Sequence, residues 1–131
     1  MKASASVWVG RVLSAFFVLF MLGASAAPKL LGMPIATEIM DGLGWPRGYV
    51  LGIGILELTL TLLYIYRPTS ILAAVLFMGL LGGAMATNMR AEQPLFSHTL
   101  FSIYLGLVMW GGLWLRDEKL RALFPWRRKD A

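Results

Sequence analysis

The sequence predicts an all-α fold: an integral membrane, four-helix transmembrane bundle with a short external cap between its first and second helices. Hydrophobic residues make up 58% of the 131 residues and the mean hydropathy is +0.70, whereas about half of a soluble domain is apolar. Four apolar stretches each approach the ~20 residues that a helix needs to cross ~30 Å of hydrocarbon. Prolines and charged residues separate these stretches.

The expected spans follow directly from these boundaries. They cover about residues 7–27, 49–66, 70–89 and 97–115. The first connection is rich in proline, the second is the tight Arg67-Pro68-Thr69, and the third runs from Arg90 to Pro94. We therefore expect a single transmembrane domain over residues 1–116, followed by a basic cytoplasmic tail over residues 117–131.

The first connection contains a short amphipathic segment over residues 35–43. Its apolar residues Ile35, Ile39, Met40 and Leu43 stand at helical spacing, and glycines at 42 and 44 end it. This spacing suits a short surface helix. An ordered loop that caps the bundle is an equally good interpretation.

The first span also has features of a cleavable signal peptide. Lys2 precedes the apolar run and Ala24-Ser25-Ala26 follows its core. Arg11 interrupts the start of the run, and the run is long for a signal core. We therefore expect a retained helix, which places both ends of the chain on one side of the membrane.

The basic residues indicate the orientation. Nine of the 12 lie on the side of the termini (Lys2, Arg11, Arg67, Arg116 and five in the tail), and Lys29, Arg47 and Arg90 lie on the other. The positive-inside rule then puts both termini in the cytoplasm. Five of the 12 basic residues lie in the tail, so we expect anionic lipid head groups as its partner and no nucleic acid.

Helical spacing also sorts small and polar residues onto single faces. These stripes are Gly54, Glu57, Thr61 and Tyr64 on the second span; Gly79, Gly83, Ala86 and Arg90 on the third; and His98, Ser102 and Gly106 on the fourth. Small residues let helices approach closely in lipid. We therefore expect all three stripes to form the inner surface of the bundle.

Several polar residues map toward the external side of the membrane. Glu57 lies eight residues into its span, about 12 Å deep, and an ionisable group at that depth usually has a partner and often a function. The candidate ligand-binding residues are Glu57, Arg90, His98, Lys29, Asn88 and Thr87. We expect them to line one cavity that opens outward.

This cluster has two interpretations. A proton-linked site for a quinone-like head group would use Arg90 and His98 as donors and Glu57 as a proton acceptor. Its aromatic walls would come from Trp45, Tyr49, Phe96, Phe101 and Tyr104. Alternatively, Glu57 and Arg90 form a buried pair that fixes the helix register, and His98 is an interfacial hydrogen-bonding residue.

Other chemistry has little support in the sequence. With no cysteine and one histidine, the chain lacks the ligands for a usual zinc, haem, copper or iron–sulfur site, and we predict no metal. It has no glycine-rich phosphate loop and no catalytic motif. Whether the chain is part of an enzyme stays open.

The order and spacing of several short segments are informative together. They are Lys29-Leu30 with Gly32 and Pro34, Leu56-Glu57-Leu58, Arg67-Pro68, the run GLLGGAMATNMR over residues 79–90, Pro94 to His98, and Trp110-Gly111-Gly112. Over roughly residues 7–116 the chain resembles the DoxX-like family of small four-helix bacterial membrane proteins. The resemblance implies a multi-pass protein of the bacterial inner membrane. Wider relatives include the membrane subunit of a thiosulfate:quinone oxidoreductase, which implies a quinone or lipid-like ligand, or a role that depends on a partner.

Three functions remain in view. The leading hypothesis is a membrane subunit of a redox-linked system, with a quinone as the candidate cofactor and a redox protein or a second copy of the chain as partner. The alternative is a non-enzymatic assembly or binding protein whose polar cluster is structural. A transporter of a small solute or protons is weaker, because four spans need to oligomerise to enclose a pathway.

Overall fold

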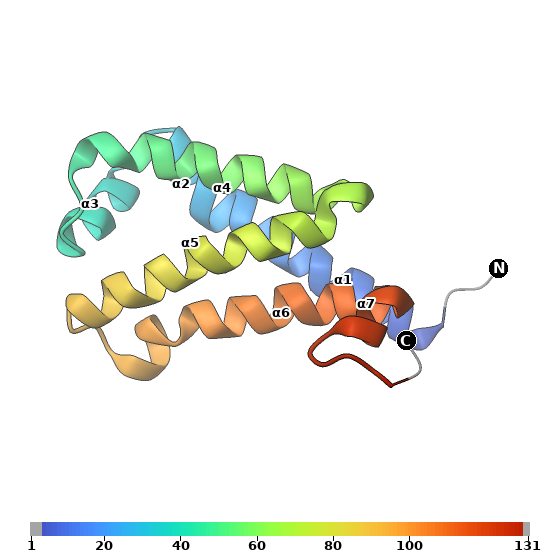
Figure 1. Ribbon diagram of the computed structural model, residues 1–131. Helices are drawn as coiled ribbons and strands as arrows, with labels where there is room; N and C mark the ends of the chain where they lie inside the picture. The colour runs from blue at the N-terminus through green and yellow to red at the C-terminus, as the bar shows by residue number, and fades with distance from the viewer. Residues whose placement is uncertain (1–3, 130–131) are drawn as a thin grey trace.

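The computed structural model describes residues 4–129, and every regular element in that part of the chain is helical. Four helical stretches are long and apolar enough to cross a membrane: Ala5–Leu30, Arg47–Ile65, Arg67–Arg90 and Leu95–Arg116. This confirms the predicted fold class. The first turns of α1 (Ala5–Phe20) and the C-terminal helix α7 (Glu118–Leu123) lie at one end of the bundle, here called the terminal end. Helix α3 (Pro34–Gly42) lies at the other, the cap end (Figure 1).

The first span is one helix with a change of winding in its second half. Helix α1 passes into a π-helical turn over Met21–Ala26, in which the Ala27 N–H bonds to the Leu22 carbonyl, and continues as α2 (Ala27–Leu30). Pro28 has no N–H to donate, and a wider turn just before it accommodates the carbonyl that this leaves free. The turn and α2 pack against α4 (Val50–Ile65).

The cap is a helix, as one of the two interpretations of residues 35–43 predicted. Gly32, with φ +66°, lets the chain turn back. Helix α3 then buries Ala36 and Met40 against Val50 at the start of α4. A 3₁₀ turn over Arg47–Tyr49 leads into that helix.

The other two spans are α5 (Ser70–Arg90), which follows a 3₁₀ turn over Arg67–Thr69, and α6 (Phe101–Arg116), which follows a π-helical turn over Leu95–Thr99. The core lies between α1, α4, α5 and α6. Phe17, Tyr64, Phe77 and Met109 are fully buried there, and the Phe17 ring meets the Phe77 ring edge-on at 5.0 Å between centroids.

The most extensive helix contact joins α1 to α6. A Cβ atom on Gly10 would lie 2.6 Å from Arg116 Cγ and 2.7 Å from the Gly112 carbonyl oxygen. Ser14 packs against Gly112 in the same way. Two stretches far apart in the sequence therefore meet backbone to backbone, as small residues in membrane helices allow.

The predicted inner surface is only partly correct. On α4 the stripe of Gly54, Glu57, Thr61 and Tyr64 is buried, as expected. On α5, Gly79 and Gly83 are exposed, and a Cβ on either would meet no neighbour within 4 Å. The expectation that this stripe faces inward is wrong, because α5 turns Ala73, Ala74, Phe77 and Leu81 toward the core instead.

The segment after the last span folds back on the bundle. The Asp117 carboxylate caps α7 by accepting from the N–H groups of Lys119 and Leu120, and Leu120 joins the core. Trp114 Nε1 donates to the Phe124 carbonyl at 2.9 Å. The first part of the predicted tail is therefore packed against the bundle.

Candidate functional site

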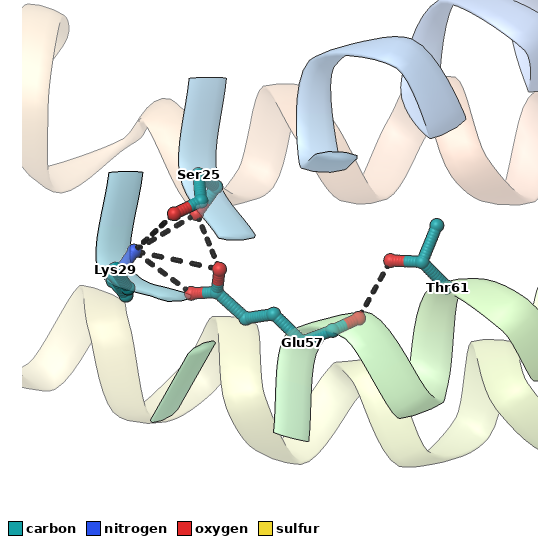
Figure 2. A network of polar contacts seen from close by, with 4 residues as sticks. All are labelled: Ser25, Lys29, Glu57 and Thr61. Carbon is teal, nitrogen blue, oxygen red and sulfur yellow. Dashed lines mark hydrogen bonds and ion pairs between the residues drawn. The ribbon is translucent and has the colours of Figure 1, made fainter. Parts of the chain in front are cut away.

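A buried polar network joins the first span to α4 (Figure 2). The Lys29 Nζ atom lies 3.1 Å from Glu57 Oε1, and the Ser25 hydroxyl donates to Glu57 Oε2 at 2.7 Å. Lys29 Nζ also donates to the carbonyl and hydroxyl oxygens of Ser25, both at 3.1 Å. The side chains of Lys29 and Glu57 are 14% and 7% exposed.

Local structure brings these three side chains together. Ser25 lies in the π-helical turn, and Lys29 follows one turn later on the same face. A Cβ on Gly54 would lie 2.8 Å from Lys29 Cβ, so the glycine lets α2 approach α4 closely. Glu57 lies three residues after Gly54 on α4, and Thr61 donates to the Glu57 carbonyl at 2.6 Å (Figure 2).

The network is electrically neutral and closed. Both carboxylate oxygens of Glu57 accept hydrogen bonds from within the bundle, and within residues 4–129 every buried side-chain nitrogen or oxygen has a partner. An unpaired charge in hydrocarbon is costly, whereas a hydrogen-bonded ion pair is compensated by its own partner. The pair therefore links α2 to α4 without needing a ligand.

Arg90 is placed differently from our expectation. Its guanidinium donates to the Leu43 carbonyl at 2.6 Å and lies against Gly44, whose φ is +84°. Of the ion pairs among residues 4–129, none joins Arg90 to Glu57. The alternative interpretation, in which Glu57 pairs with Arg90, is wrong, because the end of the cap helix offers Arg90 a backbone acceptor.

No hydrogen bond or ion pair among residues 4–129 joins the remaining candidates to Glu57. His98 is exposed, with Nδ1 2.8 Å from the Ser97 hydroxyl. Asn88 donates to the Ala84 carbonyl of its own helix at 2.8 Å, and Thr87 is half-buried. Of the six candidate residues, the structure brings together only Lys29 and Glu57. Their role in ligand binding stays a prediction.

Sequence reasoning missed Ser25. In the sequence it stands within Ala24-Ser25-Ala26, which resembles a signal-peptide cleavage site. Its position four residues before Lys29, on the same helical face, was the available signal.

Two cavities lie in the terminal half of the bundle. One, of about 190 Å³, is lined by Val7, Arg11, Arg67, Ser70, Ile71, Leu113, Arg116 and Asp117. The other, of about 300 Å³ and more open to the surface, is lined by Ser14, Ala15, Val18, Tyr64, Ile65 and Arg116. None of the six predicted candidates lines either of these two cavities.

A second buried polar contact borders the larger cavity. The Tyr64 hydroxyl donates to the Met109 carbonyl at 2.8 Å and lies 3.0 Å from the Ser14 hydroxyl, which is then the donor in that bond. Tyr64 is 2% exposed. This contact ties α4 to both α6 and α1.

Comparison with known proteins agrees with this architecture. No curated protein and no solved structure matched the chain. The model of the DoxX-like family matches residues 12–112, which cover parts of all four spans. The protein is a multi-pass membrane protein whose apolar helices contact lipid, and the chain belongs to the DoxX-like family.

Proposed function

We propose that this DoxX-like protein is a non-enzymatic membrane binding or assembly subunit, in which the Lys29–Glu57 pair is structural. The observation that carries the proposal is the closed network around Glu57, whose two carboxylate oxygens are occupied by Ser25 and Lys29. A ligand that used this carboxylate would first have to break an ion pair in a low dielectric. The network is better suited to holding α2 on α4.

The outer face of α5 is the part of the surface that suits a partner. Gly79 and Gly83 are one helical turn apart, with Ala86 on the same face, and all three are exposed. Open small-residue faces allow another helix to pack closely in lipid. This supports a helix of a partner membrane protein, or of a second copy of the chain, as the bound species.

A double-mutant cycle tests the structural role of the pair. Lys29→Met or Glu57→Leu alone leaves one buried charge unpaired, and we expect each to lower the free energy of unfolding by about 3–5 kcal/mol. Lys29→Met with Glu57→Leu removes both charges and should restore most of that loss. Arg47→Met with Asp41→Leu is the matched control, because that pair is exposed and should contribute less than about 1 kcal/mol.

Ligand analysis separates this proposal from a ligand site at Glu57. Small molecules would be extracted from the wild type and from Glu57→Gln purified from the same membrane. We expect the same phospholipids in both. If a quinone is lost from Glu57→Gln while the unfolding free energy is unchanged, the structural proposal is wrong.

The larger cavity favours a second candidate function, a membrane subunit of a redox-linked system that binds a quinone-like ligand. Ala15, Val18 and Ile65 give this cavity an apolar wall, while Tyr64, Ser14 and Arg116 add polar groups. An amphipathic head group needs this combination of apolar walls and a few donors. In this second candidate function, the ligand site is the larger cavity and does not include Glu57, Arg90 or His98.

Titration of a soluble quinone analogue into the purified protein tests the second candidate. Ala15→Phe and Ile65→Trp would fill the cavity from residues that are exposed and should weaken binding at least tenfold. His98→Ala is the control and should leave binding unchanged. Equal affinity in all four proteins would exclude this cavity as the site.

A further inference from the structure

We propose that the smaller cavity at the terminal end binds a phosphate-type anion, with the phosphate of an anionic phospholipid as the favoured source. The inference goes beyond the proposed function and depends on different residues. The cavity has a volume of about 190 Å³, well above the roughly 15 Å³ that a single water needs.

Three arginines from separate parts of the chain line this cavity. Arg11 comes from the second turn of α1, Arg67 from the turn between α4 and α5, and Arg116 from the last turn of α6. The fold therefore gathers three positive charges that are far apart in the sequence. Guanidinium groups are well suited to phosphate, because their planar donors can bind two oxygens at once.

The charges around the cavity are not balanced from within the described chain. Asp117 is the one carboxylate among the lining residues, which leaves a net charge of +2. Its Oδ1 atom already accepts from the N–H groups of Lys119 and Leu120, at 3.0 and 3.2 Å. None of the ion pairs among residues 4–129 includes Arg11, Arg67 or Arg116. A bound anion would relieve the repulsion among the three guanidinium groups.

Two of the arginines, Arg11 and Arg116, are held in place by neighbouring groups but keep free donors. The Arg11 guanidinium lies over the Trp8 ring, 4.9 Å from its centroid. Arg116 donates from Nε to the Gly112 carbonyl at 3.2 Å, and its stem packs on Gly10. Each guanidinium has five N–H donors, so these contacts position the groups and leave donors for an anion.

The surroundings favour a lipid phosphate over a soluble one. Val7, Ile71 and Leu113 give the cavity an apolar lining beside the arginines, and Trp8 next to it is 57% exposed. Tryptophan is enriched at the level of the lipid head groups. A phospholipid can therefore place its phosphate among the arginines and its chains along the bundle.

The test uses the full-length protein in detergent and measures binding by native mass spectrometry. The probes are phosphatidylglycerol, phosphatidylcholine and, in a separate arm, inorganic phosphate. The variant Arg11→Gln with Arg67→Gln removes two exposed side chains and spares Arg116, whose stem is needed for packing. Arg127→Gln with Arg128→Gln is the matched control, because it removes two exposed charges from the same end that do not line the cavity.

We expect the wild type to prefer phosphatidylglycerol over phosphatidylcholine. The cavity variant should bind phosphatidylglycerol at least tenfold more weakly, because it loses charge-assisted hydrogen bonds to the phosphate, and the control should change less than threefold. Inorganic phosphate that displaces the lipid at millimolar concentration, and fails to do so in the cavity variant, would keep the site and assign it to a soluble anion. Equal losses in the two variants, or no preference among the probes, would overturn the proposal.

Discussion

Glycine-to-alanine substitutions test the contact between α1 and α6 directly. Such a substitution usually stabilises a helix, but at this contact we expect it to destabilise the protein. Gly10 is buried, and a Cβ there would meet Arg116 Cγ at 2.6 Å and the Gly112 carbonyl oxygen at 2.7 Å. A backbone oxygen cannot move alone, so Gly10→Ala must push the two helices apart. Gly79 on α5 is the matched control, because an added Cβ there meets no atom within 4 Å.

The expected magnitudes have opposite signs. Alanine is favoured over glycine inside a helix by up to about 1 kcal/mol, and Gly79→Ala should gain that amount. Overpacking costs about 1–3 kcal/mol, and two contacts below 3.0 Å place Gly10→Ala near the upper end. After the gain in helix propensity is subtracted, we expect a net loss of about 2 kcal/mol. The two variants should therefore differ by about 3 kcal/mol.

The assay is reversible unfolding in mixed micelles by titration with sodium dodecyl sulfate, followed by far-ultraviolet circular dichroism. Gly112→Ala tests the same contact from α6 and should lose a similar free energy, because its Cβ would lie 2.9 Å from the Ser14 nitrogen. Wild-type stability in both Gly10→Ala and Gly112→Ala would refute the described helix contact. A loss in Gly79→Ala equal to that in Gly10→Ala would show that the face of α5 is covered.

Three further predictions follow from the same structure. Deletion of residues 117–131 should lower the melting temperature, because it removes the core contact of α7, whereas deletion of 125–131 should leave it unchanged; equal melting of both would show that α7 does not stabilise the bundle. Tyr64→Phe removes a buried hydroxyl that bonds to α6 and α1 and should cost about 1–3 kcal/mol in chemical unfolding, so a neutral result would contradict those bonds. Because the chain has no cysteine, Ser97→Cys and Lys119→Cys can report topology. If both termini lie in the cytoplasm, an impermeant maleimide added to intact spheroplasts should label Ser97→Cys, and it should label Lys119→Cys only after lysis.

The sequence was sufficient for the fold because hydropathy is a local property. Each span is a largely apolar stretch whose ends are marked by prolines or charges, so hydropathy predicts four membrane-length helices, and residues 4–129 contain four. The identity of the inward faces is harder to predict. Lipid and protein core are both apolar, so a stripe of small residues on α5 suits either surface, and only the packing of Phe77 and its neighbours decides between them.

The candidate site could likewise be predicted only in part from the sequence. The depth of Glu57 correctly predicted a polar partner, and Lys29 was among the candidates. Arg90 was placed in the wrong contact, because its position depends on the folded cap and on the Leu43 carbonyl that the end of α3 presents. The π-helical turn that orients Ser25 could not be predicted from residue spacing either, because spacing arguments assume a regular helix.

The two ends of the bundle differ in how they balance charge, and this difference argues for where ligand chemistry belongs. At the cap end, Lys29 pairs with Glu57, Arg47 pairs with Asp41 at 2.8 Å, and Arg90 donates to a backbone carbonyl. At the terminal end, Arg121 lies 3.9 Å from Glu118, but three other arginines surround a cavity with a single carboxylate that caps a helix. A site that is already satisfied gains little from a ligand, whereas a group of like charges gains a counter-ion. We therefore expect the terminal end to bind an anion, and the polar residues of the cap end to stabilise the fold.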